Sequence, residues 1–528
     1  MTHNSPRILM VAAENDALPG AKVGGVADVI RDLPVALNKH GCITQTVTPS
    51  YGKLARLPKL DELGHCHVRF RNKSEKVVVF KRRANQDTKN KHQADAFILH
   101  SGVFTPQGEN VYCHDGDDRP FATDATKFAF FCAAVAKALT SNLIPKPDIL
   151  HCHDWHAALL LVLIKFSEDF DSLRGIKTVF SIHNLAMQGV RPFKGDESAF
   201  ESWFPGLKVD AKDIADPNAK HCINPMRAGI LLADKIHTVS PTYAREILNP
   251  SQPELGIYGG EGLERDLKNR DVAGNLIGIL NGCEYPKSSQ KKKPLSKTHI
   301  VKLLEKAVLE SAGKNRELLA AHWIAEKRIK HWAAKKTPSM VLTSVGRITD
   351  QKARLFTTEL PEGGTALSSI LTTLGTKGVF IMVGSGDQTI EQSLVAESAQ
   401  HDNFIFINGY APDAAEALYS SGDLFMMPSS FEPCGISQLL AMRAGQPCLV
   451  NRVGGLHDTV EHDKTGFAFE GDDVESQALA MVSVFEQALK LFTTNQNDWS
   501  KICSAASKVR FTWDKSAAQY LSDLYAIE

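Results

Sequence analysis

The chain has 528 residues, more than the roughly 250–300 that one hydrophobic core organises, so two large domains are expected. Hydrophobic residues make up 43% and charged residues 23%, as is typical of a soluble globular protein. The 60 basic residues balance the 60 acidic ones, so the net charge does not favour binding to nucleic acid or to a membrane surface.

The N-terminus and the cysteines bear on the compartment. The first residues have no basic segment followed by an apolar signal core, and no apolar run approaches the length of a membrane span. The ten cysteines are scattered and form no CxxC pair. These features predict a cytoplasmic protein with reduced thiols that contacts neither membrane nor nucleic acid.

The first predicted strand, residues 7–13, leads into a glycine-bearing loop and an amphipathic helix over residues 26–38. Gly24 and Gly25 let backbone N–H groups approach an anionic ligand, and the start of the helix adds positive partial charge. Lys22 supplies a full charge. This order of strand, loop and helix predicts a phosphate-binding site.

Two segments invite a metal hypothesis. Asp115-Gly-Asp117 matches the DxD signature of metal-dependent sugar transferases, but it lies in a polar loop and is interpreted as a turn. The predicted strand over residues 149–153 ends in a run of histidines, His151-Cys-His-Asp-Trp-His156, whose order does not match a binuclear metal site. We therefore predict no metal, and keep Asp154 and His156 as polar contacts for a substrate at the end of the strand.

His183 and Asn184 directly follow the next predicted strand, residues 178–182. A single histidine is more often structural than catalytic. Its place at the carboxyl end of a strand, in the same half of the chain as Lys22 and Asp154, favours a role at a bound sugar.

The alternation of strands and helices restarts after a lysine-rich segment, residues 286–294, which we interpret as a solvated linker. Further strands are predicted at residues 339–345, 378–383, 403–408, 423–427 and 447–451. The fold class is therefore α/β, with two doubly wound domains. Ligands of such sheets bind outside the carboxyl ends of the strands, which predicts a site in a cleft between the domains.

The second half contains its own candidate residues. Arg347 and Lys352 follow an apolar strand, where two cations can stabilise the charge on a departing diphosphate, although surface cations are the plain alternative. Glu432 lies beside a proline, and Cys434, Gly435 and Ser437 then begin a helix. The amides and the Ser437 hydroxyl are predicted to hold a phosphate while Glu432 binds sugar or ribose hydroxyls; a simple helix cap is the alternative for Glu432.

Six motifs in order, KVGGVADV, HDWHA, IHNLAMQG, VSPTYAREI, GRITDQK and FEPCGISQ, together resemble the bacterial glycogen synthase and plant starch synthase family. The resemblance spans nearly the whole chain. It implies a GT-B fold, in which two Rossmann-like domains face each other across a deep cleft and domain closure assembles the site. The implied domains are 1–280, a hinge at 281–297, a nucleotide-sugar domain at 298–505, and a C-terminal segment at 506–528 whose helix crosses back to the first domain.

The resemblance further implies transfer of glucose from ADP-glucose to the non-reducing end of an α-1,4-glucan such as glycogen, with retention and without metal or other cofactor. His183 would lie beside the glucosyl ring, Arg347 and Lys352 on the diphosphate, and Glu432 would be the essential acidic residue. The other implied contacts to the substrate are Lys22, Asp28, Asn281, Tyr410, which packs on the base, and the second glycine loop with Gly455 and Thr459.

The chain departs from the pattern of many retaining GT-B enzymes at one telling position. Leu440 stands eight residues after Glu432, where a second Glu is common. Double displacement needs a positioned nucleophilic carboxylate, so we favour front-face displacement. Near the hinge, Cys283-Glu-Tyr-Pro replaces the more usual Asp and downstream Trp, and Ala-Arg rather than Gly-Leu follows Lys352.

Three alternatives remain. The nearest is another GT-B hexosyltransferase that uses UDP-glucose and a small acceptor, because the preference for ADP rests on the resemblance alone. Glucan phosphorylase needs pyridoxal phosphate and a longer chain. A catalytically silent glucan-binding protein would have no need of the paired cations Arg347 and Lys352.

Overall fold

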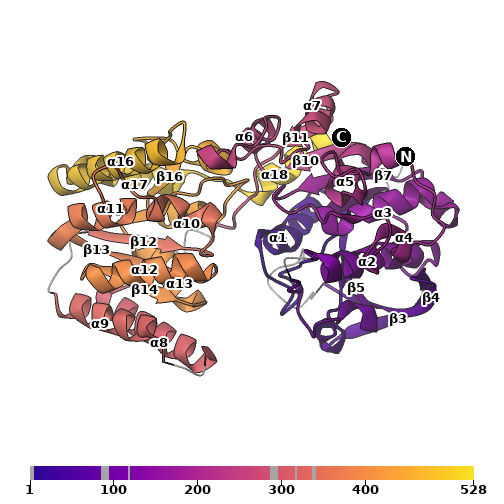
Figure 1. Ribbon diagram of the computed structural model, residues 1–528, viewed down its shortest axis with the longest axis horizontal. Helices are drawn as coiled ribbons and strands as arrows, with labels where there is room; N and C mark the ends of the chain where they lie inside the picture. Colours follow the sequence, from indigo (N-terminus) through magenta and orange to yellow (C-terminus); the bar gives the residue numbers. More distant parts are fainter. Residues whose placement is uncertain are drawn as a thin grey trace. The chain divides into compact units, whose positions relative to one another are not determined.

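The computed structural model describes residues 5–84, 94–116, 119–285, 295–315, 318–335 and 340–527. The chain folds into two compact units (Figure 1). Unit 1 contains Met1–Pro250, Gly259–Gly282 and Thr512–Glu528, and unit 2 contains Ser251–Tyr258 and Cys283–Phe511. The lysine-rich segment at 286–294, interpreted above as a linker, lies outside the described residues.

Unit 1 is built on a sheet with the strand order β11-β10-β7-β6-β1-β2-β5-β4-β3. From β11 to β5 all neighbouring strands are parallel, as the alternation of strands and helices predicts. The strands are β1 (Arg7–Val11), β2 (Ile43–Pro49), β3 (Leu60–Phe70), β4 (Lys73–Arg82), β5 (Ala96–His100), β6 (Ile149–His153), β7 (Lys177–Ile182), β10 (Lys235–Thr238) and β11 (Leu276–Gly278).

One edge of this sheet differs from the predicted parallel arrangement. β4 pairs antiparallel with both β3 and β5. Arg71 and Asn72 join β3 to β4 with φ of +51° and +57°. Positive φ at both central residues matches the twist of the flanking strands and closes a tight hairpin. The sheet is therefore mixed at this edge.

Helices cover both faces of the sheet in unit 1. Alternate residues of a strand point to opposite faces, so Leu9 and Val11 pack with α2, α3 and α5, whereas Ile8 and Met10 pack with α1 and the C-terminal helix. The helices are α1 (Gly25–Lys39), α2 (Ala122–Thr140), α3 (Trp155–Phe166), α4 (Phe200–Trp203), α5 (Pro225–Leu232), α6 (Pro241–Glu246) and α7 (Glu264–Val272). A short ladder of β8 (Arg191–Pro192) and β9 (Cys222–Ile223) lies apart from the sheet.

The C-terminal segment packs on α1. It consists of α18 (Trp513–Gln519) and a π-helical turn over Tyr520–Tyr525. The indole N–H of Trp513 donates to Asp32 Oδ2 at 3.1 Å, and Asp514 Oδ1 lies 3.0 Å from His40 Nε2. The preceding helix ends at Lys508, and α18 begins at Trp513.

Unit 2 has an all-parallel sheet in the order β14-β13-β12-β15-β16-β17. Its strands are β12 (Met340–Val345), β13 (Gly378–Gly384), β14 (Phe404–Asn408), β15 (Leu424–Met427), β16 (Cys448–Asn451) and β17 (Gly466–Phe469). Phe380 and Met382 pack under α11, α16 and α17, and Val379 and Ile381 pack under α8 and α9 on the other face (Figure 1). Burial on both faces is typical of parallel sheets.

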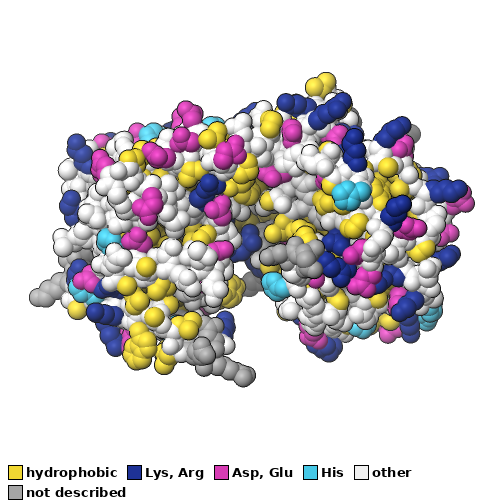
Figure 2. All heavy atoms as spheres, in the orientation of Figure 1, with side chains coloured by type: hydrophobic (Ala, Val, Ile, Leu, Met, Phe, Trp, Pro, Cys, Tyr) yellow, Lys and Arg dark blue, Asp and Glu magenta, His cyan; other side chains and the backbone are white. Residues whose placement is uncertain are grey.

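The helices of unit 2 are α8 (Lys297–Asn315), α9 (Ala320–Ala334), α10 (Asp350–Thr357), α11 (Ala366–Leu374), α12 (Gln388–Gln400), α13 (Pro412–Ser421), α14 (Ser437–Ala444), α15 (Gly454–Thr459), α16 (Val474–Thr494) and α17 (Gln496–Lys508). Basic and acidic side chains are interspersed over the visible face of each unit (Figure 2). Within the described ranges, no helix has the length and apolar character needed to span a membrane.

Candidate functional site

The glycine loop of unit 1 binds a carboxylate of the chain itself. Glu14, three residues beyond the end of β1, accepts hydrogen bonds from the backbone N–H groups of Val23 and Gly24 at 2.6 and 2.5 Å. Its other oxygen accepts the hydroxyl hydrogen bond of Tyr112 at 2.7 Å. The amides of this loop thus bind an anionic group, and in this structure that group is the buried Glu14 carboxylate.

Lys22 belongs to a charged cluster at the start of α1. Its amine bonds Asp28 Oδ1 at 2.6 Å and Asp16 Oδ2 at 3.3 Å, while Arg31 pairs with Asp16, Asp28 and Asp32. Partial burial lowers the pKa of Lys22, but the two carboxylates outweigh it and raise the pKa above its usual value. Gly25 is the first residue of α1, so Asp28 lies in the first turn, where the helix favours a carboxylate.

Asp154 holds a strained position between β6 and α3. Its φ is +56°, which costs a non-glycine residue about 1–3 kcal/mol. The carboxylate accepts a 2.7 Å hydrogen bond from the backbone N–H of His183, and thereby joins the ends of β6 and β7. Burial raises the pKa of Asp154 to about 7.

His183 lies at the end of a buried group of histidines. Its Nε2 is 2.9 Å from Nδ1 of His153. The ring of His153 stacks on His151 with centroids 4.2 Å apart, and His151 contacts the hydroxyls of Ser181 at 2.6 Å and Tyr525 at 2.7 Å. The Ser181 hydroxyl lies 2.8 Å from His237, whose Nε2 lies 3.0 Å from the Tyr520 hydroxyl.

Burial keeps these rings neutral near pH 7. It lowers the pKa of His183 to about 4 and the pKa of His237 to about 3, and it lowers the pKa values of His151 and His153 well below the usual range. His156 packs on Trp155 and Phe128, and burial lowers its pKa to about 3. Among the described residues no group of three or more His, Cys, Asp or Glu side chains is arranged to hold a metal ion.

A glycine fixes the loop after His183. Gly189 has a φ of +69°, and a Cβ there would lie 2.2 Å from the ring of Trp155. The same loop carries Asn184, whose Oδ1 accepts from the N–H of Ala186 at 2.9 Å. Asn281, also in unit 1, is 5% exposed and its Oδ1 has no hydrogen-bond partner within the described part of the chain.

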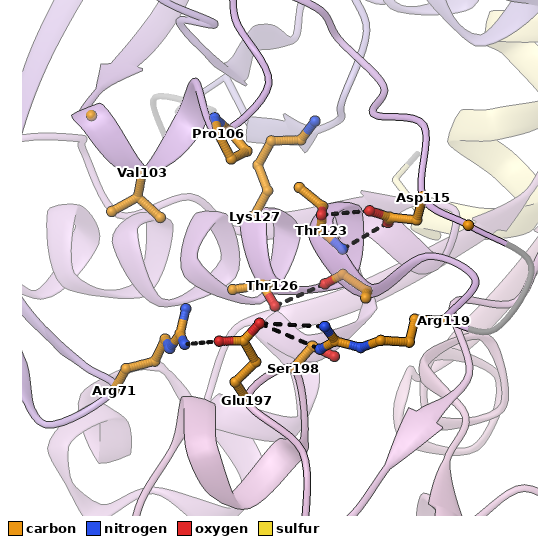
Figure 3. A pocket seen from close by; sticks show the side chains of 13 residues that line it. Arg71, Val103, Pro106, Asp115, Arg119, Thr123, Thr126, Lys127, Glu197 and Ser198 are labelled. Atoms are coloured by element: carbon orange, nitrogen blue, oxygen red, sulfur yellow. Dashed lines mark hydrogen bonds and ion pairs between the residues drawn. The ribbon is translucent and has the colours of Figure 1, made fainter.

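Unit 1 also contains a cavity of about 450 Å³, which lies apart from the residues described above (Figure 3). Its guanidinium groups are balanced, because Glu197 pairs with Arg71 and Arg119 across it at 3.5 and 3.4 Å. Asp115 accepts from the N–H and hydroxyl of Thr123 in the first turn of α2, a structural role that agrees with its interpretation as a turn residue. Asp117 lies outside the described residues. None of the site residues assigned from the motifs lines this cavity.

In unit 2 the central feature is an ion pair between Lys352, in the first turn of α10, and Glu432, in the loop after β15. Glu432 is 6% exposed, and the Ser429 hydroxyl also donates to its Oε2 at 3.1 Å. Gln351 fixes the loop, since its side chain donates to the Phe431 carbonyl at 2.9 Å and its own carbonyl accepts from the N–H of Ser430 at 2.8 Å. Arg347 lies exposed just beyond β12.

The second glycine loop packs directly against the Glu432 segment. The N–H of Gly455 donates to the Glu432 carbonyl at 3.0 Å. A Cβ on Gly454 would lie 2.0 Å from that carbonyl oxygen, and one on Gly455 would lie 2.2 Å from the Cys434 carbonyl oxygen. Only glycine fits at either position, so the backbone of one loop sets the position of the other.

The remaining predicted residues of unit 2 are mostly engaged within the fold. The Ser437 hydroxyl, at the start of α14, lies 3.0 Å from the Tyr419 hydroxyl. The buried Thr459 hydroxyl donates to the Gly455 carbonyl at 2.6 Å. Gly435 has a φ of +76°. Tyr410 is 74% exposed and the amine of Lys314 lies 5.8 Å from its ring centroid, a cation–π geometry.

The structure places two residues at the site that were given no site role from the sequence: Glu14, which lies outside the six motifs, and His153, the first residue of HDWHA. Glu14 and His153 both lie at or just beyond the carboxyl end of a strand, which is where ligands of such sheets bind. That rule, applied to every polar residue after a strand, identifies Glu14. The bond between His153 and His183 depends on the pairing of β6 with β7, in which His153 lies opposite Ser181.

Comparisons with known proteins agree with this architecture. Residues 7–269 match the family described as starch synthase catalytic domain, and residues 341–487 match glycosyl transferases group 1. The chain is 31% identical to a glycogen synthase from Francisella tularensis subsp. novicida (strain U112) over 97% of both chains. The glycogen synthase of F. tularensis subsp. tularensis (strain SCHU S4 / Schu 4) shows the same identity and coverage.

Two solved structures share the fold. The catalytic domain of starch synthase IV from Arabidopsis thaliana, bound to ADP and acarbose, superposes with a TM-score of 0.74 at 23% identity over 99% of both chains. A sucrose-phosphate synthase from Thermosynechococcus elongatus gives a TM-score of 0.55 at 16% identity, covering 99% of this chain and 98% of that one. With its motifs and its full-length likeness to curated relatives, the chain belongs to the glycogen and starch synthase family of GT-B glycosyltransferases.

Proposed function

We propose that this glycosyltransferase moves glucose from ADP-glucose to the non-reducing end of an α-1,4-glucan, with retention of configuration and without a metal or other cofactor. The observation that carries the proposal is the Lys352–Glu432 pair, held between the start of α10 and the second glycine loop. The solved starch synthase IV was bound to ADP and acarbose, which supports an adenine nucleotide and a glucan as the ligands here.

The charges of unit 2 suit a diphosphate leaving group. Lys352 lies in the first turn of α10, and Arg347, five residues before it, lies just beyond the end of β12, so two basic residues follow the same parallel strand. Fixed cations aimed at developing negative charge stabilise a transition state without having to reorganise. Protein cations therefore take the role that a divalent metal has in other sugar transferases.

Glu432 acts in this proposal as a hydroxyl-binding residue. Its carboxylate is held by Lys352 and by the Ser429 hydroxyl, so its orientation is set before substrate arrives. Leu440 stands where a second carboxylate would be needed for the alternative route through a glucosyl-enzyme.

We infer a front-face displacement. The bond between the anomeric carbon and the phosphate oxygen breaks, and the acceptor hydroxyl oxygen bonds to the same face of that carbon. The acceptor proton passes to the departing phosphate oxygen, which leaves with the electron pair of the broken bond. Isolation of a covalent glucosyl-Glu432 adduct by mass spectrometry would contradict this route.

The deciding assay measures glucose incorporation into glycogen from ADP-glucose and, separately, from UDP-glucose, with EDTA present. Incorporation from ADP-glucose that EDTA does not reduce is the expected result. Incorporation from UDP-glucose alone would overturn the donor assignment, and incorporation from neither donor would overturn the proposal. The ten cysteines, all within the described residues, form no disulfide, as is typical of a reducing compartment, so we place the reaction in the cytoplasm.

A further inference from the structure

The hydrogen bond between His153 and His183 constrains both rings. Nδ1 of His153 and Nε2 of His183 lie 2.9 Å apart, and the two residues are 1% and 8% exposed. A neutral imidazole carries one hydrogen, on one of its two nitrogens. Because burial keeps both rings neutral at pH 7, one ring must donate in this bond and the other must accept.

The surroundings of His153 decide the direction. Its Nε2 is buried and has no hydrogen-bond partner within the described part of the chain. A buried N–H without an acceptor is rarer and less favourable than a buried bare lone pair. The hydrogen of His153 therefore lies on Nδ1 and is donated to Nε2 of His183.

The direction of this hydrogen bond fixes the state of the other ring nitrogen of His183. With Nε2 accepting, the hydrogen of His183 must lie on Nδ1, the nitrogen that takes no part in the bond to His153. Resting on the function proposed above, we propose that His153 is a positioning residue that holds His183 in the Nδ1–H tautomer, so that His183 donates a hydrogen bond to a hydroxyl oxygen of the transferred sugar.

The chemistry of this donor fits a sugar hydroxyl rather than a phosphate. An uncharged N–H matches an uncharged oxygen, whereas anionic oxygens are bound best by charged donors. Unit 2 supplies such charged donors in Arg347 and Lys352. Unit 1 contributes a donor whose charge stays at zero through the physiological range, because burial lowers the pKa of His183 to about 4.

Two substitutions at one position separate tautomer control from packing. In His153→Asn the amide nitrogen takes the place of Nδ1 and still donates to His183, but the ring stacked on His151 is lost. In His153→Phe the stacked ring remains and the donor is lost. We expect kcat/KM for the sugar donor to fall about tenfold or more in His153→Phe and by no more than about threefold in His153→Asn. The reverse order would show that ring packing matters and would overturn the proposal.

A second measurement needs neither mutants at His153 nor any substrate. Nitrogen-15 NMR of the histidine-labelled wild-type protein distinguishes a protonated from a bare ring nitrogen, and the missing signals in His183→Asn assign His183. A protonated Nδ1 and a bare Nε2 are expected; the opposite pattern overturns the proposal even if both His153 variants fail to fold. Because this spectrum is independent of the sugar donor, its outcome is separate from success or failure of the ADP-glucose assay.

Discussion

In unit 1 the candidate site residues around His183 are buried, neutral rings, whereas in unit 2 they are an ion pair and glycines carried by loops. Hydrogen bonds join His183 to His153, His151 to Tyr525 and His237 to Tyr520, and the tautomer of each ring decides which partner donates. Lys352 and Glu432 of unit 2 attract each other by charge and need no particular tautomer. Under the proposed function, this difference assigns the orientation of an uncharged group to unit 1 and the neutralisation of a charged group to unit 2.

Removing the cation of unit 2 is the strongest test of this comparison. We expect Lys352→Ala to reduce turnover about a hundredfold or more, because a preorganised charge on a leaving group is worth several kcal/mol. Steady-state kinetics with ADP-glucose and glycogen measure the turnover of the variant and of the unchanged protein. Lys490→Ala, at an exposed position on α16, serves as the control and should leave turnover unchanged. Near-normal turnover in Lys352→Ala would remove this residue from the mechanism.

The second largest effect is expected from a substitution that displaces the Glu432 loop without changing any charge. In Gly454→Ala the new Cβ would meet the Glu432 carbonyl oxygen at 2.0 Å, at a φ of +44°, so the loop must move. Turnover should fall roughly tenfold to a hundredfold, since small misplacements of catalytic groups have such effects.

The matched control for that change is Gly313→Ala in α8, where a Cβ would have nothing within 4 Å. Denaturant unfolding should show it unchanged or more stable by up to about 1 kcal/mol. Full turnover in Gly454→Ala would mean that the second glycine loop does not set the position of Glu432.

Lowering the pH should destabilise unit 1 more than unit 2. The pKa values of His151, His153, His156, His183 and His237 are depressed by burial, so the unfolded chain binds protons that unit 1 does not. The unfolding free energy is therefore highest above pH 6.5. It decreases as the pH falls toward 4, by about 1.4 kcal/mol per pH unit for each histidine that titrates in the unfolded chain alone. The raised pKa values of Asp154, about 7, and of Asp423 in unit 2, about 6, act in the opposite direction.

Hydrogen exchange, corrected for the intrinsic rate at each pH, measures the pH dependence of stability for the two units separately. Between pH 6.5 and 4.5 the peptides of β6, β7 and β10 should lose protection before those of β12 and β13. Equal loss in both sheets, or earlier loss in unit 2, would contradict the assignment of the histidines as neutral and buried.

The smallest expected effect comes from a single hydroxyl. Tyr525→Phe removes the partner of His151 Nδ1, now 2.7 Å away, and leaves a buried nitrogen unpaired. The unfolding free energy should fall by about 1–3 kcal/mol, as measured by urea titration. Turnover of the folded variant should change little, because His151 meets His153 only through ring stacking. An unchanged unfolding free energy would show that this hydroxyl does not stabilise unit 1.

Short apolar runs bounded by polar residues predicted the central strands well, and β6 lies at the predicted residues 149–153. The β3–β4 hairpin was not predicted, because many charged residues within it mask the apolar alternation, as in Lys73–Arg82. Its turn also lacks the usual glycine and relies on Arg71 and Asn72 at positive φ.

In the candidate site, too, local sequence patterns predicted some residues but not the contacts between them. Motif position identified Lys352 and Glu432, but their pairing depends on a contact across eighty residues of sequence that no local pattern encodes. The motif likewise predicted free amides in the first glycine loop, and the carboxylate that binds them, Glu14, lies in a segment without a motif of its own.

The contribution of the C-terminal segment to unit 1 has a consequence during translation. Tyr520 and Tyr525 complete the hydrogen bonds of His237 and His151, yet the ribosome makes them only after Cys283–Phe511, the main part of unit 2. At roughly 5–20 residues per second this delay is on the order of ten to forty seconds. During that time the face of the unit 1 sheet that α18 later covers has no partner from this segment, so a nascent chain stalled before Trp513 is a natural client for chaperones.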